Sequence, residues 1–431
     1  MSFIYTYRTL ARIVLEAETP VKVGSGEKDI TTDARIALDI NGLPYIPGSA
    51  LAGVIRHILA GKMAETVFGG EKKGSEIIFS DANLVFEGGH VVDGILPERT
   101  PFLNLYGTLP IRQHVRIGHR GAAEDKGKFD ETVVFAGSRF CFEMELLSRQ
   151  DGKEILTQVL STLYQSYFRI GGGSRRGFGK IRVVQADIAS LDLSKEADRT
   201  LYLNKSACLD EAWQGWTPFR PETQESEGHW TTRTIHLRPE DFFLFASGNG
   251  DDDADITPTK ECKVVWRGDE PAFQEHFFVV PASSVKGALA HRITYHFNRL
   301  SGIFADQQAP EEAAGANNAA IAALFGNTTR RGHVILSDLF LTGQTKLLNH
   351  NSIDEYTGGT LDGHLFTEKV SFGRGLDLVL EISVDEQAFQ TDKVREAFNC
   401  AISDLCAGRL PLGNGSNKGN GVFTGTIDKP F

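Results

Sequence analysis

The 431-residue sequence lacks the features that mark membrane proteins, secreted proteins and folds held by zinc or disulfides. No apolar run approaches the roughly 20 residues that span a membrane. The segment MSFIYTYRTLARIVLEAE has no basic leader, apolar core and cleavage site. The five cysteines are scattered and form no CxxC pair, so neither a zinc site nor a disulfide framework is indicated. These absences predict a cytoplasmic protein with no membrane partner.

The sequence also has no overall excess of positive charge. The formal net charge is −11, whereas domains that bind nucleic acid are usually basic. Phosphate responds to the local field, however, and the cations are clustered. Residues 169–182 (RIGGGSRRGFGKIR) carry five Lys or Arg and no acid, and 111–128 carry five Lys or Arg, two His and two acids. The acidic balance therefore does not exclude a localised phosphate-binding surface.

No motif for a nucleotide or a metabolite cofactor lies between the predicted elements that such a motif requires. The chain has no GxxxxGK[ST] loop, and GGGSRRGFG (171–179) follows a predicted helix and precedes a predicted strand. A dinucleotide fingerprint requires the reverse order. What remains is a glycine turn with bare backbone N–H groups beside Arg175 and Arg176. That arrangement suits a phosphodiester backbone, and a tight structural turn is the alternative.

The most informative feature is an internal repeat. IPGSALAGVIRH (46–57) returns as VPASSVKGALAHR (280–292), each with the apolar spacing of a helix. Other segments also recur in the same order. They are a Phe-Gly loop that leads to a Ser-Asp strand (67–84 and 324–341), a hairpin (111–135 and 347–371), a helix (153–167 and 392–406) and a terminal glycine-rich turn. The repeat and the length predict two units of about 200 residues.

The repeated order of elements is strand, helix, two strands, helix, strand. It predicts an α+β protein of two tandem modified ferredoxin-like (RRM-like, βαββαβ) domains with hairpin and loop insertions. We place the domains at 1–205 and 231–431, joined by a polar linker at 206–230. Trp213, Trp216 and Trp230 are expected to pack this linker against the domains.

The repeated phrase suggests an anion site at the start of each helix. Ser49, and Ser283 or Ser284, lie where a helix would be N-capped, and helix N-termini attract anions. Basic residues follow on both helices. An ordinary cap with exposed cations is the alternative reading. The residues predicted to contact a phosphate-bearing ligand, which the resemblance described below implies is RNA, are Ser49, Arg56, His57, His114, Arg116, Arg120, Arg175, Arg176, Ser283, Lys286, His291, Arg292, His350 and Lys418.

Taken together, these motifs resemble the RAMP superfamily of CRISPR type III effector complexes. The similarity is greatest to the backbone subunit that repeats along the guide RNA, and the chain resembles two such subunits fused. The resemblance implies that each domain grips guide RNA and that a hairpin displaces bases of the duplex with target single-stranded RNA. It also implies other protein subunits as partners.

The same resemblance implies a catalytic aspartate in the loop after the first strand, which supports metal-dependent cleavage of the target RNA. Asp33 matches this position in the first half, with Asp29 as the alternate. Asp255 is the candidate in the second half, with Asp253 as the alternate, although the GDDDAD cluster could equally be a solvated acidic loop. Mg²⁺ or Mn²⁺, held by Asp33 through water, is the expected cofactor.

Two other functions fit the same sequence. The chain could be a scaffold that binds guide RNA without any chemistry. It could also be an endoribonuclease that processes guide precursors, with His114 and His119 as acid and base. The second alternative predicts cleavage without metal and without target RNA.

Overall fold

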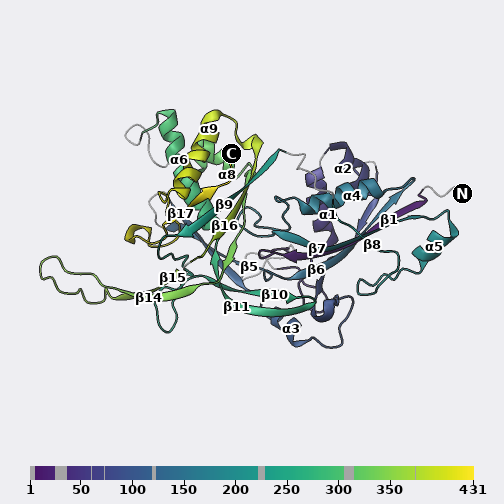
Figure 1. Cartoon of the computed structure of the whole chain (residues 1–431), viewed down its shortest axis with the longest axis horizontal. Helices are drawn as coiled ribbons and strands as arrows, with labels where there is room; N and C mark the ends of the chain where they lie inside the picture. The colour runs from purple at the N-terminus through teal and green to yellow at the C-terminus, as the bar shows by residue number, and fades with distance from the viewer. Residues whose placement is uncertain are drawn as a thin grey trace.

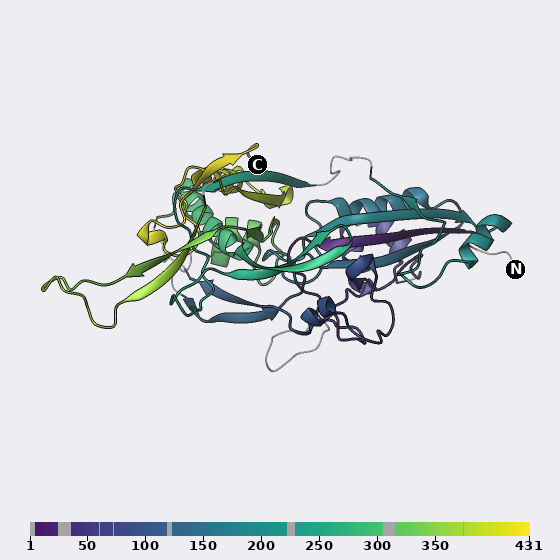
Figure 2. The same ribbon diagram turned by 60° about the horizontal axis from the view of Figure 1, so that its bottom comes forward.

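The computed structural model describes residues 5–24, 36–59, 61–71, 73–118, 123–221, 229–304, 315–373 and 375–431. Two antiparallel sheets, each covered by helices, lie side by side along the long axis (Figures 1 and 2). We call them, with their helices, the first unit and the second unit. In this part of the chain, no helix is long and apolar enough to cross a membrane.

The first unit has the strand order β2-β6-β1-β7-β8, and β3 also pairs with β6. Its elements are β1 (Tyr7–Ala17), α1 (Gly48–Leu59), α2 (Gly61–Phe68), β2 (Ile77–Phe79), β3 (Asn83–Val85), α3 (Pro101–Asn104), β6 (Arg139–Ser148), α4 (Lys153–Ser161), β7 (Ile181–Asp192), α5 (Glu196–Leu203) and β8 (Thr217–Pro218). The central strand β1 pairs with β6 and β7, with Ile13 opposite Phe142 and Ala186.

The second unit repeats this topology with the order β12-β16-β9-β17. Its elements are β9 (Trp230–Pro239), α6 (Ala282–Ser301), α8 (Ala319–Phe325), β12 (Val334–Leu336), β16 (Leu378–Asp385), α9 (Asp392–Cys406) and β17 (Phe423–Ile427). In both units the first strand of the repeat lies between the third and the fourth, which is the ferredoxin-like arrangement. The predicted α+β class and the tandem βαββαβ order are therefore confirmed.

The apolar periodicity of the sequence places one core beneath each sheet. In the first unit, α1 buries Leu51 and Ile55 against the sheet, one helical turn apart. In the second unit, α6 buries Val285, Leu289 and Ile293 at the same spacing. Burial of one helical face on an antiparallel sheet is the main source of stability for such a layer.

A hairpin of the second half completes the core of the first. This hairpin, β10 (Lys260–Arg267) and β11 (Glu270–Val280), forms a small sheet with β13 (Leu339–Leu341). Val264 is buried in the first core, and the Phe273 ring lies 4.8 Å from that of Phe135. β8 of the first sheet and the first residue of β9 lie within the predicted linker 206–230, and the domain bounds stay a prediction.

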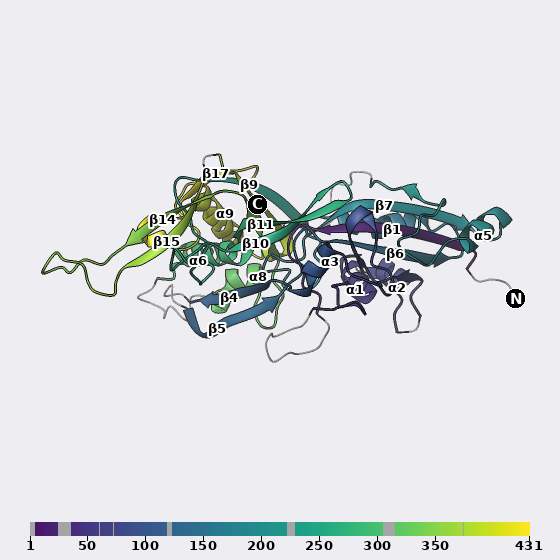
Figure 3. The ribbon, with the colours of Figure 1, turned by 90° about the horizontal axis from the view of Figure 1, so that it is seen from below.

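Two further hairpins lie outside the main sheets. They are β4 (Ile111–Ile117) with β5 (Ala123–Thr132), and β14 (Gln344–His350) with β15 (Phe366–Phe372). Figure 1 shows β14–β15 extending away from the body of the second unit. Figure 3 shows β4–β5 beneath the helices of the second unit, although it belongs to the first half of the chain. The two hairpins predicted from 111–135 and 347–371 are thus present.

The linker tryptophans pack as expected. Trp213 donates a hydrogen bond from Nε1 to the Leu201 carbonyl, and its ring meets that of Trp216 edge-on. Trp230 stacks on Tyr167 of the first unit at 4.9 Å. These aromatic contacts fix the segment between the two sheets.

Candidate nucleic-acid interface

The start of each repeated helix is capped by an aspartate from a turn between two short strands. The Gly48 amide donates to Asp81 Oδ1 at 2.8 Å, and the Ala282 amide donates to Asp338 Oδ1 at 2.7 Å. The predicted serine caps are wrong: α1 already begins at Gly48, and the N-cap of α6 is Pro281. The repeated phrase and the repeated Ser-Asp strand therefore form one structural device in each unit.

This device explains the glycine in the first copy of the phrase. A Cβ at Gly48 would lie 2.7 Å from the Ser80 carbonyl oxygen, so the helix can approach the Ser-Asp strand only without a side chain there. Ile46 and Ala82 pair beside it, as Val280 and Leu339 do in the second unit. The matching pairs show that the two copies hold the same geometry.

The histidines of the hairpins belong to a second duplicated device, which we call the hairpin lock. In the first unit His114 stacks on Phe129 with 4.9 Å between ring centroids, and its Nε2 lies 3.3 Å from Glu131 Oε2. Glu131 Oε1 also binds Lys22 and Arg176, each at 2.5 Å. The lock ties the hairpin to the glycine-rich loop that carries Arg176.

The second unit repeats the hairpin lock. His350 stacks on Phe366 at 4.9 Å, and its Nε2 lies 3.0 Å from Glu368 Oε2. Lys418 of the second glycine-rich loop binds Glu368 Oε1 at 3.2 Å and lies over the Phe366 ring. His114, His350 and Lys418, all predicted to contact RNA, thus face protein partners in both units.

The two carboxylates at the centre of these locks were missed by the sequence reasoning. Glu131 and Glu368 are buried, and each follows the stacking phenylalanine by two residues. The signal was present as KFDET (128–132) and LFTEK (365–369), a repeated Phe-x-Glu in matching places. Side chains two apart on a strand share a face, which is why one histidine reaches both.

We expect the Glu131→Gln substitution to destabilise the protein at neutral pH and to flatten its acid unfolding. Burial raises the pKa of Glu131, but the adjacent His114, a hydrogen bond from Lys22 and the charge of Arg176 outweigh it and lower this pKa from 4.5 to about 2. A depressed folded-state pKa contributes stability above the unfolded-state value, and that stability disappears as the pH falls from about 4.5 to about 2. Urea unfolding at several pH values measures the effect.

A matched control for this prediction is Glu154→Gln, which removes the same charge from an exposed position on α4. The control should keep the acid profile of the wild type. If both substitutions change the profile equally, the hairpin lock is not the source of the acid sensitivity.

A cluster of cations gathers where the two units meet. We call His57, Arg175, Arg176, Lys286 and Arg331 the junction cluster. The glycine-rich loop of the first unit lies over the start of α6, and Arg331 NH1 lies 2.8 Å from His57 Nε2 of α1. The loop between α8 and β12 supplies Arg331. Four segments that are far apart in the sequence therefore bring their cations together.

The electrostatics of the junction cluster favour an anionic ligand. Burial, together with the charges of Arg175 and Arg176, lowers the pKa of Lys286 to about 8. Burial and the charges of Arg331 and Arg169 lower the pKa of Arg175 to about 9. Neighbouring cations lower one another's pKa because their like charges repel. A phosphate bound among them would relieve this repulsion and stabilise the charged side chains. The predicted contacts Arg175, Arg176, Lys286 and His57 are thus brought together by the fold, and Arg176 and Arg175 are also held by Glu131 and by the Gly332 carbonyl.

Other predicted RNA contacts are placed differently. Arg56 and His291 are exposed on α1 and α6, as is Ser49, and Ser283 is half-buried. Arg292 pairs with Asp404 at 2.6 Å, beside His296, so it holds α6 to α9. We therefore leave Arg292 out of the proposed contacts. The Arg116 side chain and Arg120 lie outside the described residues.

The candidate catalytic aspartates are only partly described. Asp33 and Asp29 lie outside the described residues. Asp255 is exposed beside β15, where its Oδ2 accepts hydrogen bonds from the amide and hydroxyl of Thr367. These bonds lower the pKa of Asp255, which is ionised at neutral pH. The alternate, Asp253, pairs with Lys369 at 2.8 Å.

The described donor set around Asp255 is sparse. Within the described ranges, no group of three or more His, Cys, Asp or Glu is placed to hold a metal ion. Asp251 and Asp253 both bind Lys369, which leaves Asp255 as a single carboxylate. One carboxylate fits a largely hydrated Mg²⁺ or Mn²⁺ that the protein binds weakly.

One buried arginine connects the two units. Arg112 of β4 binds Asp338 at 2.7 Å and Glu261 at 2.5 Å, and its side chain is 4% exposed. Burial opposes the charge, yet Asp338 and Glu261 raise the pKa of Arg112 above its usual value. The Asp338 that caps α6 is therefore neutralised by an arginine from the other unit.

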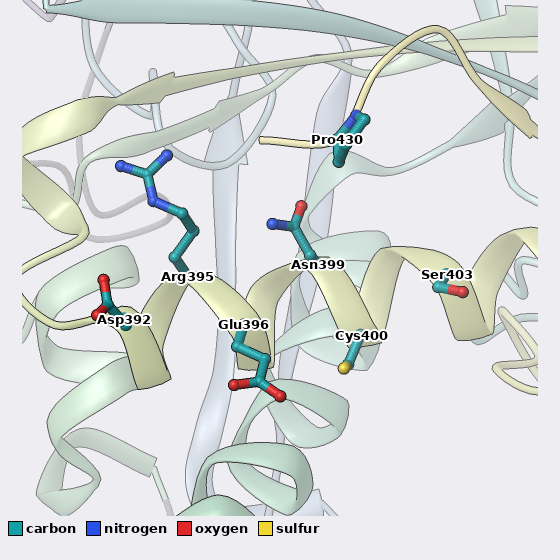
Figure 4. A pocket seen from close by; sticks show the side chains of 7 residues that line it. All are labelled: Asp392, Arg395, Glu396, Asn399, Cys400, Ser403 and Pro430. Atoms are coloured by element: carbon teal, nitrogen blue, oxygen red, sulfur yellow. The ribbon is translucent and has the colours of Figure 1, made fainter.

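A pocket on the outer face of α9 is separate from these features. Figure 4 shows the side chains that line it, which are Asp392, Arg395, Glu396, Asn399, Cys400, Ser403 and Pro430. None of them belongs to the junction cluster or to a hairpin lock.

Comparisons with known proteins give a family match and similar solved structures. The model of a family described as the RAMP superfamily matches residues 14–182 and 274–424. No curated protein matches. A cryo-EM structure of the Type III-B Cmr-beta bound to cognate target RNA is similar at 18% identity and a TM-score of 0.31, over 42% of this chain and 60% of that chain. The similarity thus spans about 60% of the length of that chain and is too low to support an argument about function.

Proposed function

Because the chain belongs to the RAMP superfamily through two separate regions, we propose that it is a backbone subunit of a CRISPR type III effector complex, in which each unit holds a stretch of guide RNA. The junction cluster supports this proposal most strongly. Its cations come from both units, and the lowered pKa values of Lys286 and Arg175, which lie close to other cations, favour a phosphate ligand. A net acidic chain can bind RNA in this way because the cations are concentrated at one place.

Recognition of the RNA would rest on its backbone. The glycine-rich loops carry few side chains that could read base edges, which suits contact with phosphates and sugars. Base pairing between guide and target would then supply the sequence specificity, while the protein reads shape. The predicted target single-stranded RNA and the other protein subunits are partners under this proposal.

The hairpin β14–β15 would be the element that displaces bases. Its outer part exposes large apolar side chains, with Tyr356 89%, Leu365 71% and Ile353 63% exposed. Aromatic and aliphatic side chains that project from a scaffold can stack on or wedge between bases. Their exposure has no role in the core of this chain, which favours a contact with a partner.

Removal of two cations from the junction cluster should weaken RNA binding. We expect Lys286→Gln with Arg331→Gln to lower the affinity for single-stranded RNA and to reduce the slope of log affinity against log salt by about 0.7 for each cation–phosphate pair removed. Fluorescence anisotropy at several salt concentrations measures both quantities. Lys153→Gln with Lys195→Gln, exposed on α4 and before α5, removes the same charge elsewhere. An equal fall in affinity for both double variants would mean that only net charge matters.

We further propose that this subunit cleaves target RNA with Asp33 and, in the second unit, with Asp255 as the catalytic carboxylates. A displaced nucleotide allows its 2′-OH to lie in line with the neighbouring phosphorus, which a stacked A-form helix prevents. The carboxylate would accept the 2′-OH proton, directly or through a water molecule. The 2′-oxygen would then bond to phosphorus as the bond from phosphorus to the 5′-oxygen breaks, and the 5′-oxygen would take a proton from water. A hydrated Mg²⁺ or Mn²⁺, when bound, would offset the charge that develops on the phosphate.

A non-catalytic guide-RNA scaffold is the second candidate. It is favoured in the second unit, where Asp253 is held by Lys369 and Asp255 by Thr367. The guide-precursor-processing endoribonuclease is disfavoured, because His114 is buried in its stack with Phe129 and pairs with Glu131. His119 lies outside the described residues.

A further inference from the structure

The contact between the two units has a donor face and an acceptor face. The donor face belongs to the first unit and consists of Arg112, Arg169, Arg175 and Gly177. The acceptor face belongs to the second unit and is centred on Ser337, Asp338 and the start of α6. Besides the Arg112–Asp338 pair, Arg169 NH2 donates to Ser337 Oγ at 2.7 Å, and Arg175 Nε donates to the Gly332 carbonyl at 2.9 Å.

Glycine at position 177 is required for this contact. A Cβ there would lie 2.1 Å from Asp338 Oδ1 and 2.8 Å from the Ala282 Cβ. The Asp338 amide also donates to the Gly177 carbonyl at 3.3 Å. The loop backbone thus lies directly on the start of α6, and the side chain of Asp338 is fully covered.

The first unit carries its own copy of the acceptor face, and that copy is uncovered. Asp81 caps Gly48 as Asp338 caps Ala282. Asp81 and Ser49 are nevertheless exposed. Among the described residues, no cation forms an ion pair with Asp81, whereas Asp338 is held by Arg112. The first unit therefore presents a formed but unfilled acceptor face.

The second unit, in contrast, has lost the arginines of the donor face. The register of the hairpins places Leu348 where the first unit has Arg112, because His114 pairs with Phe129 as His350 pairs with Phe366. The two glycine-rich loops are aligned by a matching hydrogen bond: the Ile170 amide donates to the Gly179 carbonyl, and the Leu412 amide donates to the Gly421 carbonyl. They place Pro411 and Asn417 at the positions of Arg169 and Arg175.

The second unit lacks the interface arginines but keeps the hairpin lock. The hairpin lock keeps its histidine, phenylalanine, carboxylate and loop cation in both units. Gly419 also keeps the positive φ of Gly177. At the three positions whose arginines contact the neighbouring unit, the second unit has Leu348, Pro411 and Asn417. A second copy of this chain would therefore bring Leu348, Pro411 and Asn417 to Asp81 and leave the carboxylate without a cation.

We propose that the face around Asp81 docks an arginine-bearing strand and glycine-rich loop of a different subunit, and that the three replacements in the second unit prevent a second copy of this chain from docking there. The partner is defined by chemistry: at least one arginine aimed at Asp81 and a glycine where the loop crosses the start of α1. Charge complementarity and the filled copy of the same interface within this chain support it. The inference rests on the proposed function only in that the chain is one subunit of an assembly.

The test restores the missing arginines in the full chain. Leu348→Arg, Pro411→Arg and Asn417→Arg together should make the protein associate head to tail with itself in a concentration- and salt-dependent manner, measured by sedimentation velocity without RNA. The wild type should stay monomeric. Adding Asp81→Asn to the triple variant should weaken self-association about tenfold or more, because it leaves each new arginine without its carboxylate. Asparagine still accepts the Gly48 amide, so the helix cap is kept.

Each outcome of this experiment either supports or contradicts the proposed docking face. Self-association of the triple variant that depends on Asp81 supports it. A triple variant that is folded by circular dichroism but monomeric contradicts it, as does self-association that is indifferent to Asp81→Asn. Self-association of the wild type through Asp81 would also contradict it. Since RNA is absent, a failure of RNA binding in this chain would not change any of these results.

Discussion

Replacing Arg112 with methionine is expected to lower the free energy of unfolding by about 3–5 kcal/mol. The substitution leaves Asp338 and Glu261 without a cation, and the side chain of Asp338 is 0% exposed in the folded protein. The cost comes from the uncompensated carboxylates rather than from a missing attraction, because a buried ion pair gains little over an apolar pair. Urea denaturation followed by circular dichroism measures the change.

Two variants make this prediction specific. Arg8→Met removes an arginine from a pair with Glu145 whose side chains are 19% and 26% exposed, and it should cost about 1 kcal/mol, because solvent partly screens this pair. Adding Asp338→Asn to Arg112→Met should restore part of the stability, because it removes one of the stranded charges while Oδ1 still accepts the Ala282 amide. Equal destabilisation by Arg112→Met and Arg8→Met would show that the two units are not held together by this buried contact.

Replacing Asp33 with alanine is expected to abolish one cleavage product of a guide-complementary RNA, with a rate reduction of about 10²-fold or more. The assay uses the assembled complex with Mg²⁺ or with EDTA. The affinity for RNA should stay unchanged, because the carboxylate takes part in the cleavage step and not in RNA binding. Asp255→Ala, alone and with Asp33→Ala, then shows whether the second unit also cleaves.

Asp252→Ala is the matched control, since it removes an exposed acid from the same loop as Asp255. It should leave the product ladder intact. If wild type, Asp33→Ala and Asp255→Ala all give the same ladder, cleavage belongs to other subunits and this chain is a scaffold. Cleavage that persists in EDTA would contradict the role proposed for the metal.

The fold could be predicted because the same pattern of apolar residues occurs independently in both halves of the sequence. The helical spacing of Leu51 and Ile55 returns in Val285 and Leu289, and such periodicity reports directly which face is buried. The crossover of β10–β11 into the first core could not be predicted. Val264 lies in an ordinary alternating strand, and its sequence does not indicate which of two cores receives it.

The candidate site could be predicted only in part, for a related physical reason. The sequence identified Arg175, Arg176 and Lys286 as cations, and the fold brings them together. It assigned the helix caps to serines because these are local, whereas the carboxylates that cap, Asp81 and Asp338, come from turns tens of residues away. Long-range partners of this kind leave no local signal beyond the repeated Ser-Asp itself.

The central claim is that both units hold one RNA. Photo-cross-linking of the full chain to 4-thiouridine-labelled single-stranded RNA, followed by mass spectrometry of the cross-linked peptides, tests it most directly. The account predicts cross-links at or beside both glycine-rich loops, 171–179 and 413–421, on the same RNA molecule. Cross-links confined to one unit, or found only on the outer face of α9, would contradict it.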